Sequence, residues 1–101
     1  MTKRDMVVRI ARQTGLTQRD VMDVVQRSLD MITDELAAGR DVEFRNFGVF
    51  EPTVRQSRIG RNPNVPKETV QIPKRVVVKF KPGKVMSARV NQLSPQDVSQ
   101  D

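Results

Sequence analysis

Residues 53–72 read TVRQSRIGRNPNVPKETVQI, and this segment has the pattern of two strands joined by a long turn. The outward strand is predicted at 53–59 and the returning strand at 69–72, with Gly, Pro and Asn concentrated between them. Both strands carry few apolar side chains, so the pair has little to bury in a core. We therefore expect an arm that protrudes from the body of the protein.

Arginines make this arm positively charged, and prolines mark its two ends. Arg55, Arg58 and Arg61 recur at every third position, which spreads positive charge over both faces of a twisted ribbon. Pro52 and Pro73 stand at the two ends of the segment, where we expect them to interrupt strand pairing and form a flexible base.

The residues on either side of the arm predict the strands of the body. Residues 42–45 alternate apolar and charged side chains, residues 46–48 form a turn, and the strand resumes at 49–50. Residues 75–81 read as a central strand. The four phenylalanines lie in these segments, and we expect them to fill a core at the centre of a dimer rather than to stack on bases: Phe44, Phe47, Phe50 and Phe80.

Helices are predicted at both ends of the chain. Thr2 and Thr17 each stand three residues before an aspartate, and each opens a stretch with apolar side chains at helical spacing. Gly15 ends the first helix and Gly39 ends the second, which spans about 20 residues. Its apolar stripe is typical of a helix that covers a sheet or a second subunit. A short third helix is expected to begin near Lys84, with three inward-facing side chains: Val85, Ala88 and Val90.

Length and composition bound the protein class. The chain has 101 residues, 37% hydrophobic but only 4% aromatic, so we expect one domain with a thin core that a second chain completes. The predicted class is α+β: a helical hairpin base, an antiparallel sheet with a protruding ribbon, and a short C-terminal helix. No apolar run approaches the roughly 20 residues of a membrane span, which favours a soluble intracellular protein.

Positive charge is concentrated in the second half. The net charge is +6 overall, −1 over residues 1–43, +9 over residues 44–93 and −2 in the remaining tail. This asymmetry favours a surface that binds a polyanion, although a merely solubilising cationic face is the alternative.

Catalysis is disfavoured by the residue types available. The chain has no Cys and no His, which excludes thiol nucleophiles and Cys/His zinc sites. Four aspartates line the outer face of the second helix, and we interpret them as a solvated face, with Asp23 and Arg27 forming an i,i+4 pair. A nuclease would need clustered carboxylates near the basic surface, where Glu51 and Glu68 are the only acids. We predict no enzyme activity, no cofactor and no metal.

Several motifs together resemble the bacterial HU and integration host factor (IHF) family. They are Gly48 with Phe50, Gly60-Arg61-Asn62-Pro63, Ile72-Pro73 and Phe80-Lys81-Pro82-Gly83-Lys84. The resemblance runs from about Thr2 to Val90. It implies an intertwined dimer of the bacterial nucleoid, in the cytoplasm, whose β-ribbon arms hold double-stranded DNA in the minor groove and bend it.

The resemblance also assigns roles to single residues. Pro63 falls on the family's intercalating proline, with Arg61 and Asn62 beside it in the groove. Further DNA contacts are implied along the arm and its base and on the body: Lys3, Arg45, Arg55, Arg58, Gln71, Lys74, Arg75, Lys81 and Lys84.

Two details differ from the family pattern. Asn46-Phe47-Gly48 replaces the frequent Gly-Phe-Gly, and the turn after Pro63 has no glycine and is one residue longer. The chain also continues beyond the usual HU end in a way similar to an IHF subunit.

We expect residues 1–93 to form the dimerisation and DNA-binding domain, with the arm at about 53–73 and a flexible tail at 94–101. Three questions stay open. The dimer can be a homodimer or a heterodimer with a paralogous subunit, and DNA binding can be site-specific or serve general compaction. The alternative function is a basic RNA-binding or ribosome-associated module.

Overall fold

The helical hairpin forms where the capping residues predict it. The computed structural model describes residues 1–56, 58–62 and 65–98, with the backbone alone for 58–62 and 65–72. Helix α1 (Lys3–Thr14) begins with a capping box, in which Thr2 Oγ1 accepts from the Asp5 amide at 3.1 Å and Asp5 Oδ2 accepts from the Thr2 amide at 3.0 Å. Helix α2 (Gln18–Ala37) is capped by Thr17, which accepts from the Asp20 amide at 3.1 Å. Gly15 has φ 78°, the left-handed conformation that lets the chain leave α1 without a Cβ clash.

The buried core within the described residues is small. It contains Val7, Ala11 and Val21, with Ile10, Met22 and Val25 partly buried around them. These side chains hold α1 against α2. Two apolar side chains of α2, Val24 and Leu29, are exposed. The hairpin therefore buries one side of its apolar surface and leaves another uncovered.

Three antiparallel strands form the sheet of the body. They are β1 (Val42–Phe44), β2 (Gly48–Arg55) and β5 (Arg75–Pro82), in the order β1-β2-β5. The prediction of a central strand at 75–81 was wrong, because β5 is an edge strand and β2 lies in the centre. The tight turn after β1 places β2 beside it at once, so the returning chain pairs along the other side of β2. Val76 and Val78, which lie on one face of β5, are exposed as well.

Close backbone packing fixes the turn between β1 and β2. Asn46 has φ 68°, a left-handed conformation that Asn tolerates better than most residues. Gly83, which follows β5, donates its amide to the Phe47 carbonyl at 2.7 Å. A Cβ on Gly48 would lie 2.5 Å from Cζ of Phe80 and 2.7 Å from the carbonyl oxygen of Lys81. This corner therefore requires the absence of a side chain at Gly48.

Gly48→Ala is expected to lower the free energy of unfolding by about 2 kcal/mol, because the added methyl group must displace the Phe80 ring or the β5 backbone. Thermal unfolding followed by circular dichroism measures the loss. Gly39→Ala is the matched control, since Gly39 has φ 82° but open space around its missing Cβ, so that only backbone strain of about 1 kcal/mol is added. Equal losses in the two variants would contradict the packing role of Gly48.

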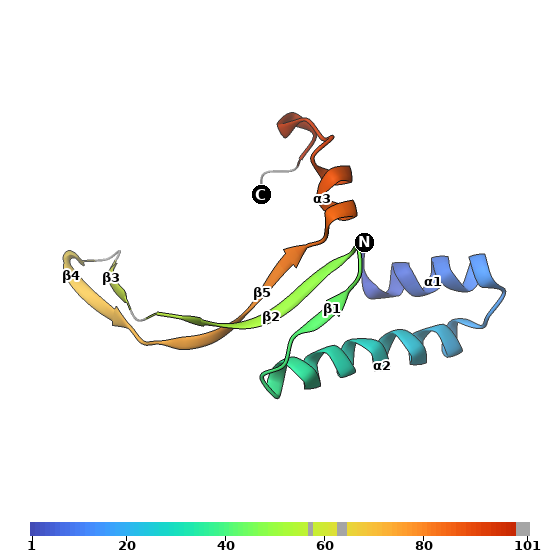
Figure 1. The fold of residues 1–101 in the computed structure, drawn as a ribbon, viewed down its shortest axis with the longest axis horizontal. Helices are drawn as coiled ribbons and strands as arrows, with labels where there is room; N and C mark the ends of the chain where they lie inside the picture. Colours follow the sequence, from blue (N-terminus) through green and yellow to red (C-terminus); the bar gives the residue numbers. More distant parts are fainter. Residues whose placement is uncertain (57, 63–64, 99–101) are drawn as a thin grey trace.

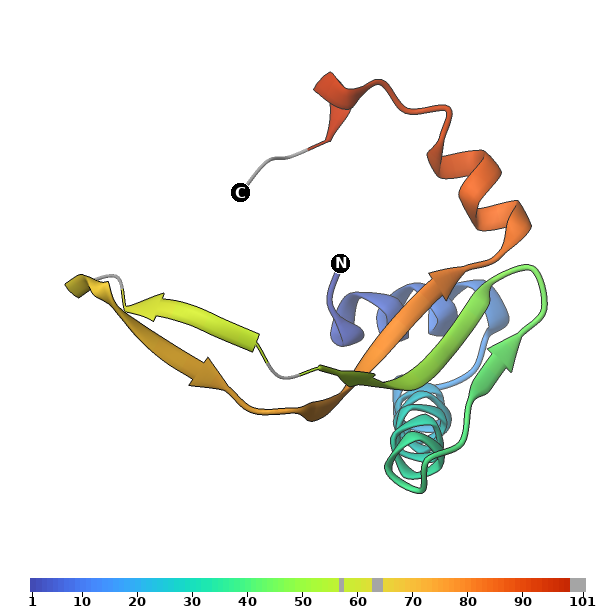
Figure 2. The same cartoon turned by 60° about the vertical axis from the view of Figure 1, so that its left-hand side comes forward.

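A long two-stranded ribbon leaves the body (Figure 1). Beyond the short β1, only β2 and β5 remain paired, and the ribbon continues through β3 (Arg58–Asn62) and β4 (Val65–Ile72), which pair with each other. Figure 2 shows the ribbon bending away from the sheet between these two pairs. The radius of gyration is 19.0 Å, against about 13 Å for a compact chain of this length.

The two prolines at the base of the ribbon behave differently. Pro52 was expected to interrupt pairing, but it lies inside β2 opposite Val78. A proline is accommodated there because β2 has no partner on its other side beyond β1. Pro73 does lie in the break between β4 and β5.

The C-terminal helix lies apart from the hairpin (Figures 1 and 2). Helix α3 (Lys84–Val90) begins as predicted and is followed by the short 3₁₀ helix η1 (Pro95–Asp97). Its three apolar side chains were expected to face inward, but Val85 is 48% exposed, Val90 is 57% exposed, and Ala88 is exposed as well. No described helix or strand packs extensively over α3, so this face is uncovered in the single chain.

Candidate nucleic-acid interface

Two arginines face each other where the ribbon bends. Arg55 ends β2 and Arg75 begins β5, and the two are directly opposite in the strand register. Both side chains are exposed, and neither forms an ion pair within the described residues. Like charges opposite each other on neighbouring strands repel, so this pair destabilises the free ribbon and would be relieved by an anion between them. Lys74 adds a third exposed cation in the adjoining break.

The next part of the ribbon carries the remaining predicted arm residues. The backbone places Arg58 opposite Ile72, Gln71 opposite Ile59, and Arg61 opposite Thr69. The register shifts between Arg61 and Asn62, at the approach to the turn. Pro63, the predicted wedge, lies outside the described residues. The four predicted contact residues of this pair thus lie on two adjacent strands: Arg58, Arg61, Asn62 and Gln71.

On the body, Lys81 is held by a carboxylate. Its Nζ lies 2.7 Å from Oε1 of Glu51, an atom that is buried beneath the lysine. The hydrogen bond and the charge of Glu51 raise the pKa of the Lys81 ammonium group, with a smaller contribution from Asp41. The sequence interpretation treated Lys81 as a free phosphate ligand and missed this pair, because the diagonal contact depends on the register of β2 and β5.

The other predicted body residues are exposed cations. Lys3 donates to Gln26 Oε1 from the first turn of α1. Lys84 is the first residue of α3, and Arg45 lies in the turn before β2. Because Gly83 packs against Asn46, the neighbouring Arg45 and Lys84 belong to one corner of the body.

The four phenylalanines form one cluster that is open on one side. Ring centroids are 6.1 Å apart for Phe44 and Phe47, 5.7 Å for Phe47 and Phe80, and 4.7 Å for Phe50 and Phe80. Phe44 and Phe47 are nevertheless 43% and 47% exposed. Since aromatic side chains of this size are rarely left so exposed in a stable domain, the cluster is an incomplete core.

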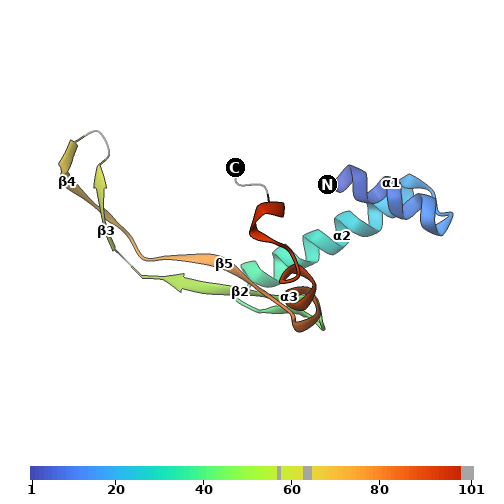
Figure 3. The same ribbon diagram turned by 90° about the horizontal axis from the view of Figure 1, so that it is seen from above.

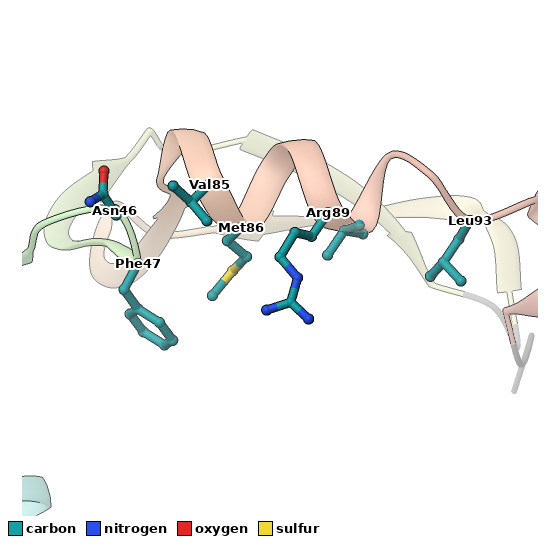
Figure 4. A pocket seen from close by; sticks show the side chains of 7 residues that line it. Asn46, Phe47, Val85, Met86, Arg89 and Leu93 are labelled. Carbon is teal, nitrogen blue, oxygen red and sulfur yellow. The ribbon is translucent and has the colours of Figure 1, made fainter.

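A shallow groove continues from this cluster along α3 (Figure 4). Figure 4 shows Phe47, Met86, Arg89 and Leu93 pointing to the same side of the helix. The groove has a volume of about 680 Å³ and a mainly apolar lining. The uncovered face of α3 and the phenylalanine cluster are therefore one continuous apolar surface.

Comparison with known proteins assigns the chain to a family. The family described as "Bacterial DNA-binding protein" matches residues 1–91. The chain belongs to this family, which contains the HU and IHF proteins. It is 41% identical to the integration host factor subunit beta of Halorhodospira halophila over 97 residues, 95% of this chain and 94% of the relative. It is 39% identical to the DNA-binding protein HU of Thermotoga maritima over 90 residues, 89% and 99% of the two chains.

The fold of this HU/IHF-family chain is also found in solved structures. A cocrystal structure of Anabaena HU with DNA matches with a TM-score of 0.84 and 30% identity, covering 92% of this chain and 100% of that one. The predicted resemblance and α+β class are thereby confirmed. Nothing in these comparisons supports the RNA-binding alternative. Within the described residues, no helix is both long and apolar enough to cross a membrane.

Arg55→Gln is expected to weaken binding of duplex DNA without lowering the free energy of unfolding. Removing the repulsion with Arg75 should leave the free energy of unfolding unchanged or raise it by up to about 0.5 kcal/mol. The same change should weaken duplex binding and make its salt dependence shallower by about 0.9 in log–log slope. Arg27→Gln is the control, since Arg27 is paired with Asp23 on α2 at 3.0 Å. Weaker folding with unchanged duplex affinity would show that Arg55 is a structural residue instead.

Proposed function

We propose that this chain is one subunit of a dimeric, non-enzymatic architectural protein of the bacterial nucleoid, in the cytoplasm, which binds double-stranded DNA through the minor groove and bends it. The observation that carries this proposal is the long ribbon, which consists of the β2–β5 pair followed by the β3–β4 pair and packs over no core. Arg55 and Arg75 lie opposite each other where the β2–β5 pair ends. The Anabaena HU chain that was crystallised with DNA has the same fold.

The two-stranded ribbon is the element that would hold the duplex. Two paired strands are the element that enters a groove in β-ribbon DNA-binding proteins, HU and IHF among them. The cations that would hold phosphates supply affinity without reading sequence. They comprise Arg55, Lys74 and Arg75 at the base of the arm, Arg58 further along it, and Lys3, Arg45, Lys81 and Lys84 on the body. Gln71, also on the arm, would add an uncharged hydrogen-bonding contact.

The tip of the arm supplies the bend. Pro63 is a rigid apolar ring without an N–H group, suited to enter a base step and keep it unstacked. Arg61 and Asn62 would lie beside it in the groove. Unstacking costs a few kcal/mol per step, which contacts along the bent flanks offset, as is general for minor-groove architectural proteins including this family.

A second subunit completes the core. The phenylalanine cluster and the face of α3 leave an apolar surface that one chain does not cover. Homodimers and heterodimers with a paralogous subunit would both cover it. A relative named as a beta subunit of IHF is 41% identical over 95% of this chain, and one named as an alpha subunit is 37% identical over 96%.

Dimerisation is expected to make the melting temperature rise with protein concentration, because the folded state is linked to association by mass action. Thermal unfolding at about 1 and 100 μM, combined with sedimentation of the folded protein, measures this dependence. A sedimenting monomer whose melting temperature is independent of concentration would contradict a shared core.

The class of nucleic acid is tested by competition. Binding of a labelled linear duplex is challenged with unlabelled duplex DNA, nicked duplex DNA and a structured RNA of equal charge. We expect both DNAs to compete well and the RNA poorly. Stronger competition by RNA than by DNA would favour an RNA-binding module. Selection of bound sequences from a random duplex pool then separates a preferred site from general compaction.

A further inference from the structure

The face of α1 that points away from α2 is strongly basic. Arg4, Arg9 and Arg12 are exposed on it, and a groove of about 530 Å³ runs between them, with Met1, Asp5 and Val8 completing its lining. Segment Lys3–Thr14 has a net charge of +3, whereas Gln18–Ala37 has a net charge of −3. The near-neutral sum of the first half of the chain therefore conceals two helices of opposite charge.

The three arginines are not neutralised within the described residues. The one acid in the groove, Asp5, accepts from the Thr2 amide at 3.0 Å as part of the helix cap. By contrast, Arg27 is paired with Asp23 at 3.0 Å and Arg40 with Glu35 at 2.9 Å. Of the arginines on the hairpin and just after it, those two are committed to carboxylates, while the arginines of the α1 face are available to an external anion.

The spacing along the helix suits an extended polyanion. Arg4 and Arg12 are eight residues apart, which is about 12 Å of helix rise. Duplex DNA carries one charge per about 3.4 Å of axis on each strand, so this face spans several successive phosphates. A small anion would instead need the guanidinium groups to converge on one point. The apolar side chains of Met1 and Val8 in the groove give the arginine stems a surface to pack on.

The position of this face separates it from the arm. The β3–β4 pair and α1 lie at opposite ends of the longest axis, which measures 60 Å (Figures 1 and 3). The sheet contacts α2 far more than α1, so the α1 face does not belong to the surface at the base of the ribbon.

We propose that the Arg4–Arg9–Arg12 face is a second DNA-binding surface, which holds the backbone of another duplex while the ribbon clasps the first. This inference rests on the proposed function. The protein would then bridge two DNA segments as well as bend one, and the second contact would be electrostatic and independent of base sequence.

The test is a capture experiment with two duplexes. A short duplex is immobilised, full-length protein is bound to it, and capture of a second, fluorescent duplex is measured at about 100 mM salt. In Arg9→Gln/Arg12→Gln, which removes two positive charges, we expect capture to fall by about tenfold or more while affinity for a single short duplex changes by less than about twofold. Arg27→Gln/Arg40→Gln removes the same charge from paired sites and is expected to keep full capture. Circular dichroism melts confirm that both variants are folded.

Each other outcome overturns the inference. If the wild-type protein binds the first duplex but captures no second one, there is no bridging surface. If both variants lose capture equally, net charge and not this face is responsible. If Arg9→Gln/Arg12→Gln instead weakens binding of one long duplex and shortens its protected region, the face holds the flank of the clasped duplex. Failure to bind the first duplex at all would overturn the proposed function itself, and is seen separately in the first binding step.

Discussion

Raising the salt concentration from 50 to 200 mM should weaken duplex binding by about a thousandfold. If about six phosphates are neutralised, log K falls with log salt with a slope near −5, since each neutralised phosphate contributes about −0.9. Arg55 and Arg75 are exposed and form no ion pair within the described part of the chain, so they can neutralise phosphate without first losing a protein partner. Lys81 is different, because it must share its charge with Glu51.

Titrations of a fluorescent duplex at several salt concentrations measure this slope. The double variant Arg55→Gln/Arg75→Gln should make the slope shallower by about 1.8. Arg27→Gln/Arg40→Gln removes the same charge elsewhere and should leave the slope within about 0.5 of the wild-type value. A wild-type slope near zero would reject electrostatic binding by these surfaces.

Pro63→Ala should strongly reduce the bending of a linear duplex while leaving affinity for a prebent or nicked duplex largely intact. Alanine has neither the ring that fills an opened base step nor the rigidity that holds it there, so the cost of unstacking is no longer offset. In a nicked duplex much of that cost is already removed. Energy transfer between dyes at the two ends of the duplex measures the bend.

Pro66→Ala is the matched control for this change. It removes a proline near the tip of the same arm, at the start of β4, but Pro66 is not at the position that the family resemblance assigns to the wedge. Bending should therefore persist in Pro66→Ala. Unchanged bending in Pro63→Ala, or an equal loss in both variants, would remove the specific role of Pro63.

Local features of the fold were predictable from the sequence. The two capped helices, the left-handed Gly15 and the start of α3 at Lys84 depend on residues within one or two turns of each other. The ribbon was predictable for a related reason, since a strand pair with few apolar side chains has little to bury in a core. The Asp23–Arg27 pair likewise follows from i,i+4 spacing.

Features that depend on strand order or on a second chain were not predictable in the same way. The valine-rich β5 has the composition of a central strand, yet it is an edge strand whose Val76 and Val78 are exposed. The phenylalanine pattern predicts a core, but the exposure of Phe44 and Phe47 becomes visible only in the folded chain. The pair of Glu51 and Lys81 depends on the register between β2 and β5.

The charge arithmetic of the sequence also missed a feature. The net charge summed over residues 1–43 is close to zero, which gives no indication that the helical hairpin binds a polyanion. The structure separates this sum into the basic face of α1 and the acidic face of α2. Helical periodicity applied to charged residues, as well as to apolar ones, is the signal that would have found it.

The most direct test of a duplex clasped by the ribbon uses a DNA-cleaving probe tethered to one cysteine at a time. The chain has no cysteine of its own, so Thr69→Cys on β4 and Asp34→Cys on α2 each give a single attachment site. We expect the probe on β4 to cut the bound duplex with the strand offset of the minor groove, and the probe on α2 to cut it weakly. Strong cutting from α2 with none from β4 would contradict a duplex held in the minor groove by the arms.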